Sequence, residues 1–109
     1  MSLLLGLMLA TTGFHGVVVR GPTSPVCHEG QSCTEPAVGT VLVFSRGGRD
    51  AGRARAGAGG RYAIRLPPGY YTVRTAAAPA IGRGLRPRRV HVARGVYGRL
   101  DFSVDTGIR

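Results

Sequence analysis

Lysine is absent from this chain of 109 residues, and acidic residues are few. All 15 basic residues are arginine, only five residues are Asp or Glu, and the formal net charge is +10. An excess of positive charge of this size favours acidic partners such as nucleic acid, anionic lipid or acidic polysaccharide. The arginines are nevertheless scattered, with one denser group at residues 82–89, and a composition rich in Gly, Ala, Val, Pro and Arg is also typical of a G+C-rich coding sequence. Charge alone therefore leaves a polyanion partner and a compositional explanation both open.

Because acidic residues are few and widely spaced, the sequence offers no pair of carboxylates for general-acid catalysis. The histidines His15, His28 and His91 stand near no recognisable nucleophile and orienting group, and a solvated surface position explains each of them. The glycine cluster at residues 57–60 leads into an expected strand, whereas a phosphate-binding loop leads into a helix. We therefore predict that the chain is not an enzyme, has no catalytic residue and binds no cofactor.

The chain also lacks a long hydrophobic run. The apolar segment at residues 3–10 would span about 12 Å as a helix, whereas a membrane-crossing helix needs about 20 residues. Its length suits the hydrophobic region of a signal peptide, and small residues follow it, although no Lys or Arg precedes it. We predict that residues 1–13 are a signal peptide or truncated leader, and that residues 14–109 form one domain that is secreted or held at the cell envelope.

Only two cysteines are present, Cys27 and Cys33, in the stretch CHEGQSC. An even number of cysteines in a small exported chain favours a disulfide, which would contribute about 2 kcal/mol by closing so short a loop. The alternatives are free thiols or a metal site formed by Cys27, His28 and Cys33. The metal site lacks a fourth ligand at a recognised spacing. We predict a Cys27–Cys33 disulfide and no metal.

Helical periodicity is absent after residue 13, because apolar residues recur at every second position and Gly or Pro interrupts the chain every ten residues or so. The break at Pro67, Pro68 and Gly69 separates two alternating runs and predicts a β-hairpin over residues 61–74. Residues 40–45 are apolar on both faces and are expected in a central strand, and residues 52–56 in an edge strand. Short strands joined by turns indicate an all-β antiparallel sandwich or small barrel. The expected strands cover residues 14–20, 40–45, 52–56, 61–66, 70–74, 88–93 and 96–105.

Alternation within these strands separates core residues from surface residues. The hairpin and the last strand place Tyr62, Ile64, Leu66, Tyr71, Val73 and Phe102 in the core. Other strands add Val18, Val41, Val43, Val90, Val92, Leu100 and Val104. The outward residues of the hairpin are Arg61, Arg65, Tyr70, Thr72 and Arg74.

These outward residues form the best candidate binding face in the sequence. Basic residues interleaved with an aromatic are typical of surfaces that bind polyanions, including single-stranded nucleic acid. A carbohydrate is a second candidate ligand, since Tyr70 and Tyr97 could stack on a sugar. Outward arginines also have the ordinary role of keeping a sheet soluble and protecting its edges.

The order of these motifs resembles a known family. The stretches GVVVRGP, PAVGTVLVF, GGRYAIRLPPGYYTV and GRLDFSVDTGIR follow one another between residues 14 and 109. Together they resemble the carboxypeptidase regulatory-like domain, a transthyretin-like (prealbumin-like) β-sandwich, in its short bacterial exported form. The resemblance implies a seven-stranded Greek-key sandwich with Tyr62 and Tyr71 flanking the Pro-Pro-Gly turn. It also implies a non-catalytic structural or protein-interaction role at the cell envelope, and it transfers no active site.

Overall fold

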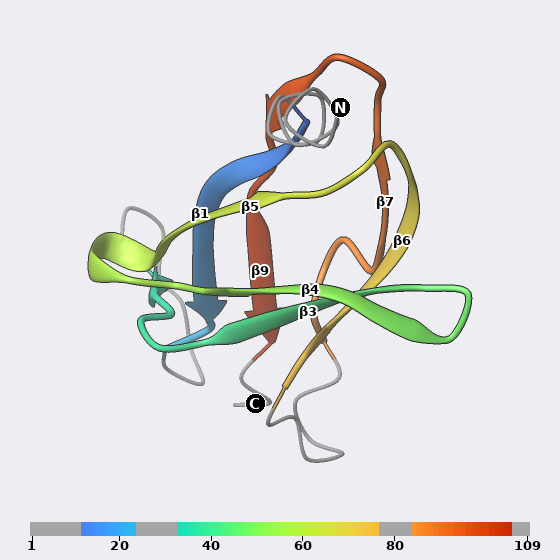
Figure 1. The fold of residues 1–109 in the computed structure, drawn as a ribbon. Helices are drawn as coiled ribbons and strands as arrows, with labels where there is room; N and C mark the ends of the chain where they lie inside the picture. The colour runs from blue at the N-terminus through green and yellow to red at the C-terminus, as the bar shows by residue number, and fades with distance from the viewer. Residues whose placement is uncertain (1–11, 24–32, 77–83, 106–109) are drawn as a thin grey trace.

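A computed structural model describes residues 12–23, 33–76 and 84–105 of the chain (Figure 1). The described part is almost entirely β-structure, in two sheets, and its one helical element is a single 3₁₀ turn. The elements are β1 (Gly13–Gly21), β2 (Glu35–Pro36), β3 (Val41–Arg46), β4 (Arg49–Arg55), η1 (Ala58–Gly60), β5 (Arg61–Arg65), β6 (Gly69–Thr75), β7 (Arg89–Val92), β8 (Tyr97–Arg99) and β9 (Phe102–Asp105).

The first sheet is built around β1. Strands β2 and β5 pair with β1 in the antiparallel sense, whereas β8 and β9 pair with it in the parallel sense. The second sheet has the order β4-β3-β6-β7, and all of its pairs are antiparallel. In Figure 1, β3 and β4 run across β1 and β9. The apolar core cluster combines buried residues of both sheets, so it lies between the two layers. The structure is therefore the expected all-β arrangement of two facing sheets, with parallel pairs where only antiparallel ones were predicted.

The predicted last strand is divided into β8 and β9. Arg99 pairs with His15 and Phe102 pairs with Val18, so the register on β1 is the same on both sides of the break. Within the break, a carboxylate oxygen of Asp101 accepts the backbone N–H of Val17 at 2.9 Å. A side chain thus replaces the backbone acceptor that a continuous strand would supply, and the ladder is interrupted without a shift.

The predicted hairpin is wrong. Strand β5 belongs to the first sheet and β6 to the second, so residues 67–69 form an arch that carries the chain from one layer to the other. Two successive prolines donate no backbone hydrogen bond and hold φ fixed, which ends β5 at the point where a hairpin would need ladder donors. The arch is tied at both prolines, since the hydroxyl of Tyr71 donates to the carbonyl of Pro67 at 2.5 Å and Arg46 donates to that of Pro68 at 3.3 Å.

The core lies between the sheets. The ring of Phe44 lies 6.4 Å from that of Phe14 and 6.0 Å from that of Phe102, so Phe44 joins the second sheet to two strands of the first. The buried residues include all of the core positions singled out in the predicted hairpin and last strand: Tyr62, Ile64, Leu66, Tyr71, Val73 and Phe102. Val18, Val90 and Val92 are also buried, and Leu100 and Val104 are partly buried against the same cluster.

The predicted orientation of β3 is wrong by one residue. Leu42 and Phe44 contact the core cluster, whereas Val41 is only half-buried and Val43 is buried outside that cluster. Strand neighbours alternate between faces, so Val43 lies on the outer side of the sheet, paired with Arg53 and Arg74. Because the strand is apolar at four consecutive positions, alternation could not identify its inner face.

The structure moves the predicted start of the domain. Gly13 is the first residue of β1, and the buried side chain of Thr12 donates a hydrogen bond to the carbonyl of Leu66 at 2.5 Å. These two residues, which we assigned to the leader, therefore take part in the fold. The remainder of the predicted leader, residues 1–11, lies outside the described residues, and its role as a signal peptide stays a prediction.

Two adjacent tyrosines give a matched test of which face of β6 is buried. Tyr71 is 3% exposed and Tyr70 is 75% exposed. We expect Tyr71→Ala to lower the free energy of unfolding by about 3–5 kcal/mol, as truncation of a buried aromatic side chain does. We expect Tyr70→Ala to cost less than about 1 kcal/mol, because only a surface ring contact is lost. Urea denaturation measures both values, and equal losses would contradict this orientation of β6.

Candidate binding faces

The predicted binding face is divided between the two sheets. Arg61 and Arg65 lie on β5 of the first sheet, and Tyr70, Thr72 and Arg74 lie on β6 of the second. All of these side chains are exposed, as expected, but the arch separates them into different layers. The chain therefore has two candidate faces, which we call the first outer face (His15, Arg61, Arg65, Tyr97 and Arg99) and the second outer face (Asp50, Tyr70, Thr72, Arg74 and His91).

An aromatic and cationic cluster occupies one end of the first outer face. The guanidinium carbon of Arg65 lies 3.8 Å from the centre of the Tyr97 ring, and the His15 ring lies 4.9 Å from it. Arg65 and Tyr97 both pair with Gly13, which has no side chain between them. A Cβ atom at Gly13 would lie 2.1 Å from the carbonyl oxygen of Ile64, so only glycine fits there. The contacts of Arg65 and His15 leave Tyr97 poorly placed to stack on a ligand.

A hollow of about 240 Å³ lies beside this cluster. Arg61 and Arg99 stand on strands that flank β1 on opposite sides. Arg99 forms an ion pair with Asp101 at 3.3 Å, whereas Arg61 forms no ion pair with any residue in the described ranges. The residues that line the hollow are His15, Gly16, Val17, Arg61, Tyr62 and Arg99. Two arginines from different strands therefore border one concavity on the first outer face.

The second outer face carries an open aromatic ring. Tyr70 lies opposite His91 on the neighbouring strand, and the two rings stack at 4.3 Å. Arg74 is held by Asp50 at 3.2 Å and donates to the hydroxyl of Ser45 at the same distance. The positive charge of Arg74 is therefore already matched by a carboxylate.

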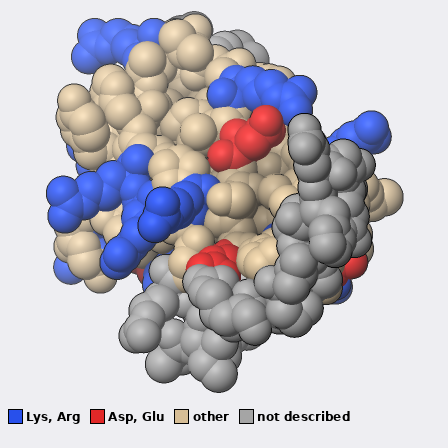
Figure 2. Space-filling model, turned by 180° about the vertical axis from the view of Figure 1, so that it is seen from behind, with Lys and Arg blue, Asp and Glu red and all other residues tan. Residues whose placement is uncertain are grey.

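Charged side chains also mark the edges of the second sheet. Strand β4 carries the exposed residues Arg49, Arg53 and Arg55, and β7 at the other edge carries Arg89. Seen from behind in Figure 2, arginines form separate groups with uncharged surface between them, and only a few acidic side chains are visible. On this side of the molecule, the arginines of the described residues therefore do not form a single continuous stripe.

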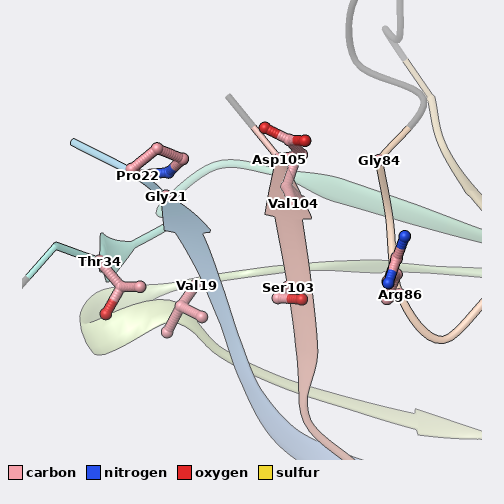
Figure 3. Close-up of a pocket in the computed structure, with 9 residues that line it drawn as sticks. All are labelled: Val19, Gly21, Pro22, Thr34, Gly84, Arg86, Ser103, Val104 and Asp105. Atoms are coloured by element: carbon pink, nitrogen blue, oxygen red, sulfur yellow. The ribbon is translucent and has the colours of Figure 1, made fainter. Parts of the chain in front are cut away.

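A larger pocket of about 360 Å³ lies where β1 and β9 end side by side (Figure 3). The backbones of Arg86 and Ser103 bond to each other at 2.9 Å in both directions, which brings residues 84–86 alongside β9. The lining residues are Val19, Gly21, Pro22, Thr34, Gly84, Arg86, Ser103, Val104 and Asp105. These described residues include no histidine, cysteine or lysine that could activate Ser103 or Thr34 as a nucleophile.

The predicted disulfide and the metal alternative depend on residues that are not described. Cys27 and His28 lie outside the described residues, so the Cys27–Cys33 pairing stays a prediction. The backbone N–H of Thr23 donates to the carbonyl of Cys33 at 2.9 Å, so the residues on either side of segment 24–32 lie next to each other. Elsewhere, the described segments contain no group of three or more His, Cys, Asp and Glu side chains arranged to hold a metal ion.

Sequence reasoning missed several members of the two faces. Tyr97 was predicted only as a residue that could stack on a sugar, and its neighbours His15 and Arg99 were missed, because the three come together through parallel pairing of β8 with β1, for which no local pattern exists. His91 was treated as an isolated surface histidine, although its outward position on a neighbouring strand could have suggested a contact with Tyr70. Asp50 lies between two of the expected strands, so its pairing with Arg74 required knowledge of the sheet order.

Neither a scan against protein-family models nor a search of curated proteins found a match to this chain. In the described ranges, no helix is both long enough and apolar enough to pass through a bilayer.

The contact between Arg74 and Asp50 predicts a pH-dependent contribution to stability. The hydrogen bond from Arg74, followed by that from Ser45, lowers the pKa of Asp50 below its ordinary value of 3.8. Folding therefore favours the ionised carboxylate, and this stabilisation is present above pH 3.8 and is lost as the pH falls through the lower folded-state pKa. We expect Asp50→Asn to be less stable than the wild type near neutral pH. This difference in stability should narrow at acidic pH, where Asp50 of the wild type becomes protonated. Urea midpoints measured across the acidic range test this.

Arg55→Gln is the control for this comparison, because it removes a charge from the same strand at a position that pairs with Val41 rather than with Ser45. The difference in urea midpoint between Arg55→Gln and the wild type should not narrow as the pH falls. A constant difference between Asp50→Asn and the wild type throughout the acidic range would contradict the role of Asp50.

Proposed function

We propose that this chain is a non-catalytic, exported β-sandwich module with a structural or protein-interaction role at the cell envelope. The observation that carries the proposal is the location of its functional groups. The space between the sheets is filled by the apolar cluster around Phe44, and the two clusters that combine aromatic and charged side chains lie on the outer faces. Such a molecule acts through what its rigid surfaces contact, and no catalytic activity is expected of it.

The sheet order supports the finer proposal of a seven-stranded, transthyretin-like Greek-key sandwich of the carboxypeptidase regulatory-like type. Strands β8 and β9 share one register and count as a single strand, and β2 consists of only two residues. With β2 set aside, seven strands remain. The chain leaves the second sheet after β4, forms β5 in the first sheet and returns as β6 beside β3, which is a Greek-key type of connection.

Two sequence features support export. The short apolar segment at residues 3–10 fits a secretory signal, and a pair of cysteines in a small domain fits an oxidising compartment. These features are independent of the two sheets, so localisation and fold can be tested separately.

Binding of an anionic polymer is the second candidate function. The first outer face presents Arg61, Arg65 and Arg99 against one carboxylate, that of Asp101, and the whole chain carries a net charge of +10. Binding of a neutral carbohydrate has less support, because Tyr97 is engaged by Arg65 and His15 and leaves Tyr70 as the exposed ring. An anionic polysaccharide is accordingly the polymer that this face fits best.

Co-sedimentation with the cell-envelope fraction of the encoding organism tests both functions. We expect the purified chain to sediment with this fraction and to be released once the fraction has been digested with a proteinase, because the proposed partner is a protein. If an anionic polymer is the partner, binding should survive digestion and fall steeply as salt is raised from about 50 to about 200 mM. A basic protein of unrelated fold and similar net charge controls for non-specific adsorption. Sedimentation no greater than that of the control would contradict both functions.

A further inference from the structure

We propose that the hollow between Arg61 and Arg99 on the first outer face binds one oxyanion group, a sulfate or a carboxylate, of an acidic polysaccharide. This inference rests on the second candidate function and assigns it to a single site. It concerns the described residues around β1 alone.

The hollow is bordered by arginines because of the register of the first sheet. Val17 pairs with Arg61 on β5, and His15 pairs with Arg99 on β8, so the two arginines and His15 share the outer side of the sheet. Gly16 lies between His15 and Val17 and contributes no side chain to the concavity. The hollow has a volume of about 240 Å³, several times the roughly 30 Å³ of a water molecule, so a solvated oxyanion can enter it.

The charges around the hollow favour an anion. Arg61 has no carboxylate partner among the described residues, so its guanidinium is available to form a bidentate contact with an oxyanion. Asp101 is the nearby carboxylate, and it is engaged twice, by the backbone N–H of Val17 at 2.9 Å and by Arg99 at 3.3 Å. Asp101 therefore offsets the charge of Arg99 and leaves that of Arg61 unmatched among the described residues.

The aromatic groups on this face favour a polysaccharide over single-stranded nucleic acid. Proteins that bind single strands without sequence preference stack successive bases on open aromatic rings. Here the ring of Tyr97 is covered by Arg65 at 3.8 Å and contacts His15, so among the described residues Tyr97 is not an open stacking ring beside the two arginines. The open ring of Tyr70 belongs to the other sheet. An anionic sugar chain needs only the guanidinium contacts.

The test measures binding of the full chain to three probes: a sulfated heparin oligosaccharide, a polygalacturonate oligosaccharide and single-stranded oligo(dT). Isothermal titration calorimetry is carried out at about 0.15 M salt, where the screening length is about 8 Å and remote charges contribute little. The variants are Arg61→Gln and, as a matched control, Arg89→Gln, which removes the same charge from an exposed position on β7 of the second sheet. Circular dichroism and urea denaturation establish that both variants remain folded.

We expect Arg61→Gln to weaken binding of an acidic oligosaccharide by about tenfold or more, as loss of a charged hydrogen-bonding partner does. Arg89→Gln should weaken it by less than about twofold, because the screened charge is remote from the hollow. Arg61→Lys should restore part of the loss, since it retains the charge but not the bidentate geometry. Whichever of the two polysaccharides shows this pattern identifies the preferred oxyanion.

The failures are distinguishable from one another. Equal weakening by Arg61→Gln and Arg89→Gln would overturn the site, since binding would then depend on net charge alone, and would leave the second candidate function standing. Tighter binding of oligo(dT) than of either oligosaccharide would overturn the assignment to a polysaccharide. Absence of binding by the wild type to all three probes would overturn both the site and the second candidate function.

Discussion

The fold depends on one strand, β1, that is hydrogen-bonded along both of its edges. Strands β2 and β5 pair with one edge of β1, and β8 and β9 pair with its other edge. Every strand of the first sheet is therefore hydrogen-bonded to β1. The contact between Val17 and Asp101 joins residues 84 positions apart, which is most of the described chain. Closing so long a loop costs conformational entropy, which the burial of Phe14, Val18 and Phe102 must offset. The first sheet therefore depends on the core for its stability.

Much of the strand content could be predicted from the sequence, because alternation within a strand is a local property. Buried and exposed positions alternate in β5, β6 and β7 as the alternation of apolar and polar residues in the sequence predicts, from Tyr62 to Val92. Where both faces are apolar, as in residues 41–44, the local pattern carries no orientation, and the inner face of β3 was assigned to the wrong residues. Pairing is non-local, so neither the parallel partners of β1 nor the exchange of sheets at residues 67–69 could be read from a window of sequence.

The arch explains why the candidate site could be predicted only in part. The outward residues of β5 and β6 look continuous in the sequence, yet the chain turns from one layer to the other between them. Each group then acquires neighbours that are remote in sequence. Arg65 lies over Tyr97, and Tyr70 stacks on His91. The two outer faces therefore differ in chemistry. The first has arginines around a hollow, and the second has the exposed ring of Tyr70 and the ion pair of Arg74 with Asp50.

The arginines on the border strands of the second sheet also affect how copies of this protein meet. Unpaired strand edges invite a second molecule to add its own strand. Two β4 edges brought together would place Arg49, Arg53 and Arg55 of one copy against the same residues of the other, with Asp50 as the one acid on that strand. The like charges make the addition of a second copy at the β4 edge unfavourable.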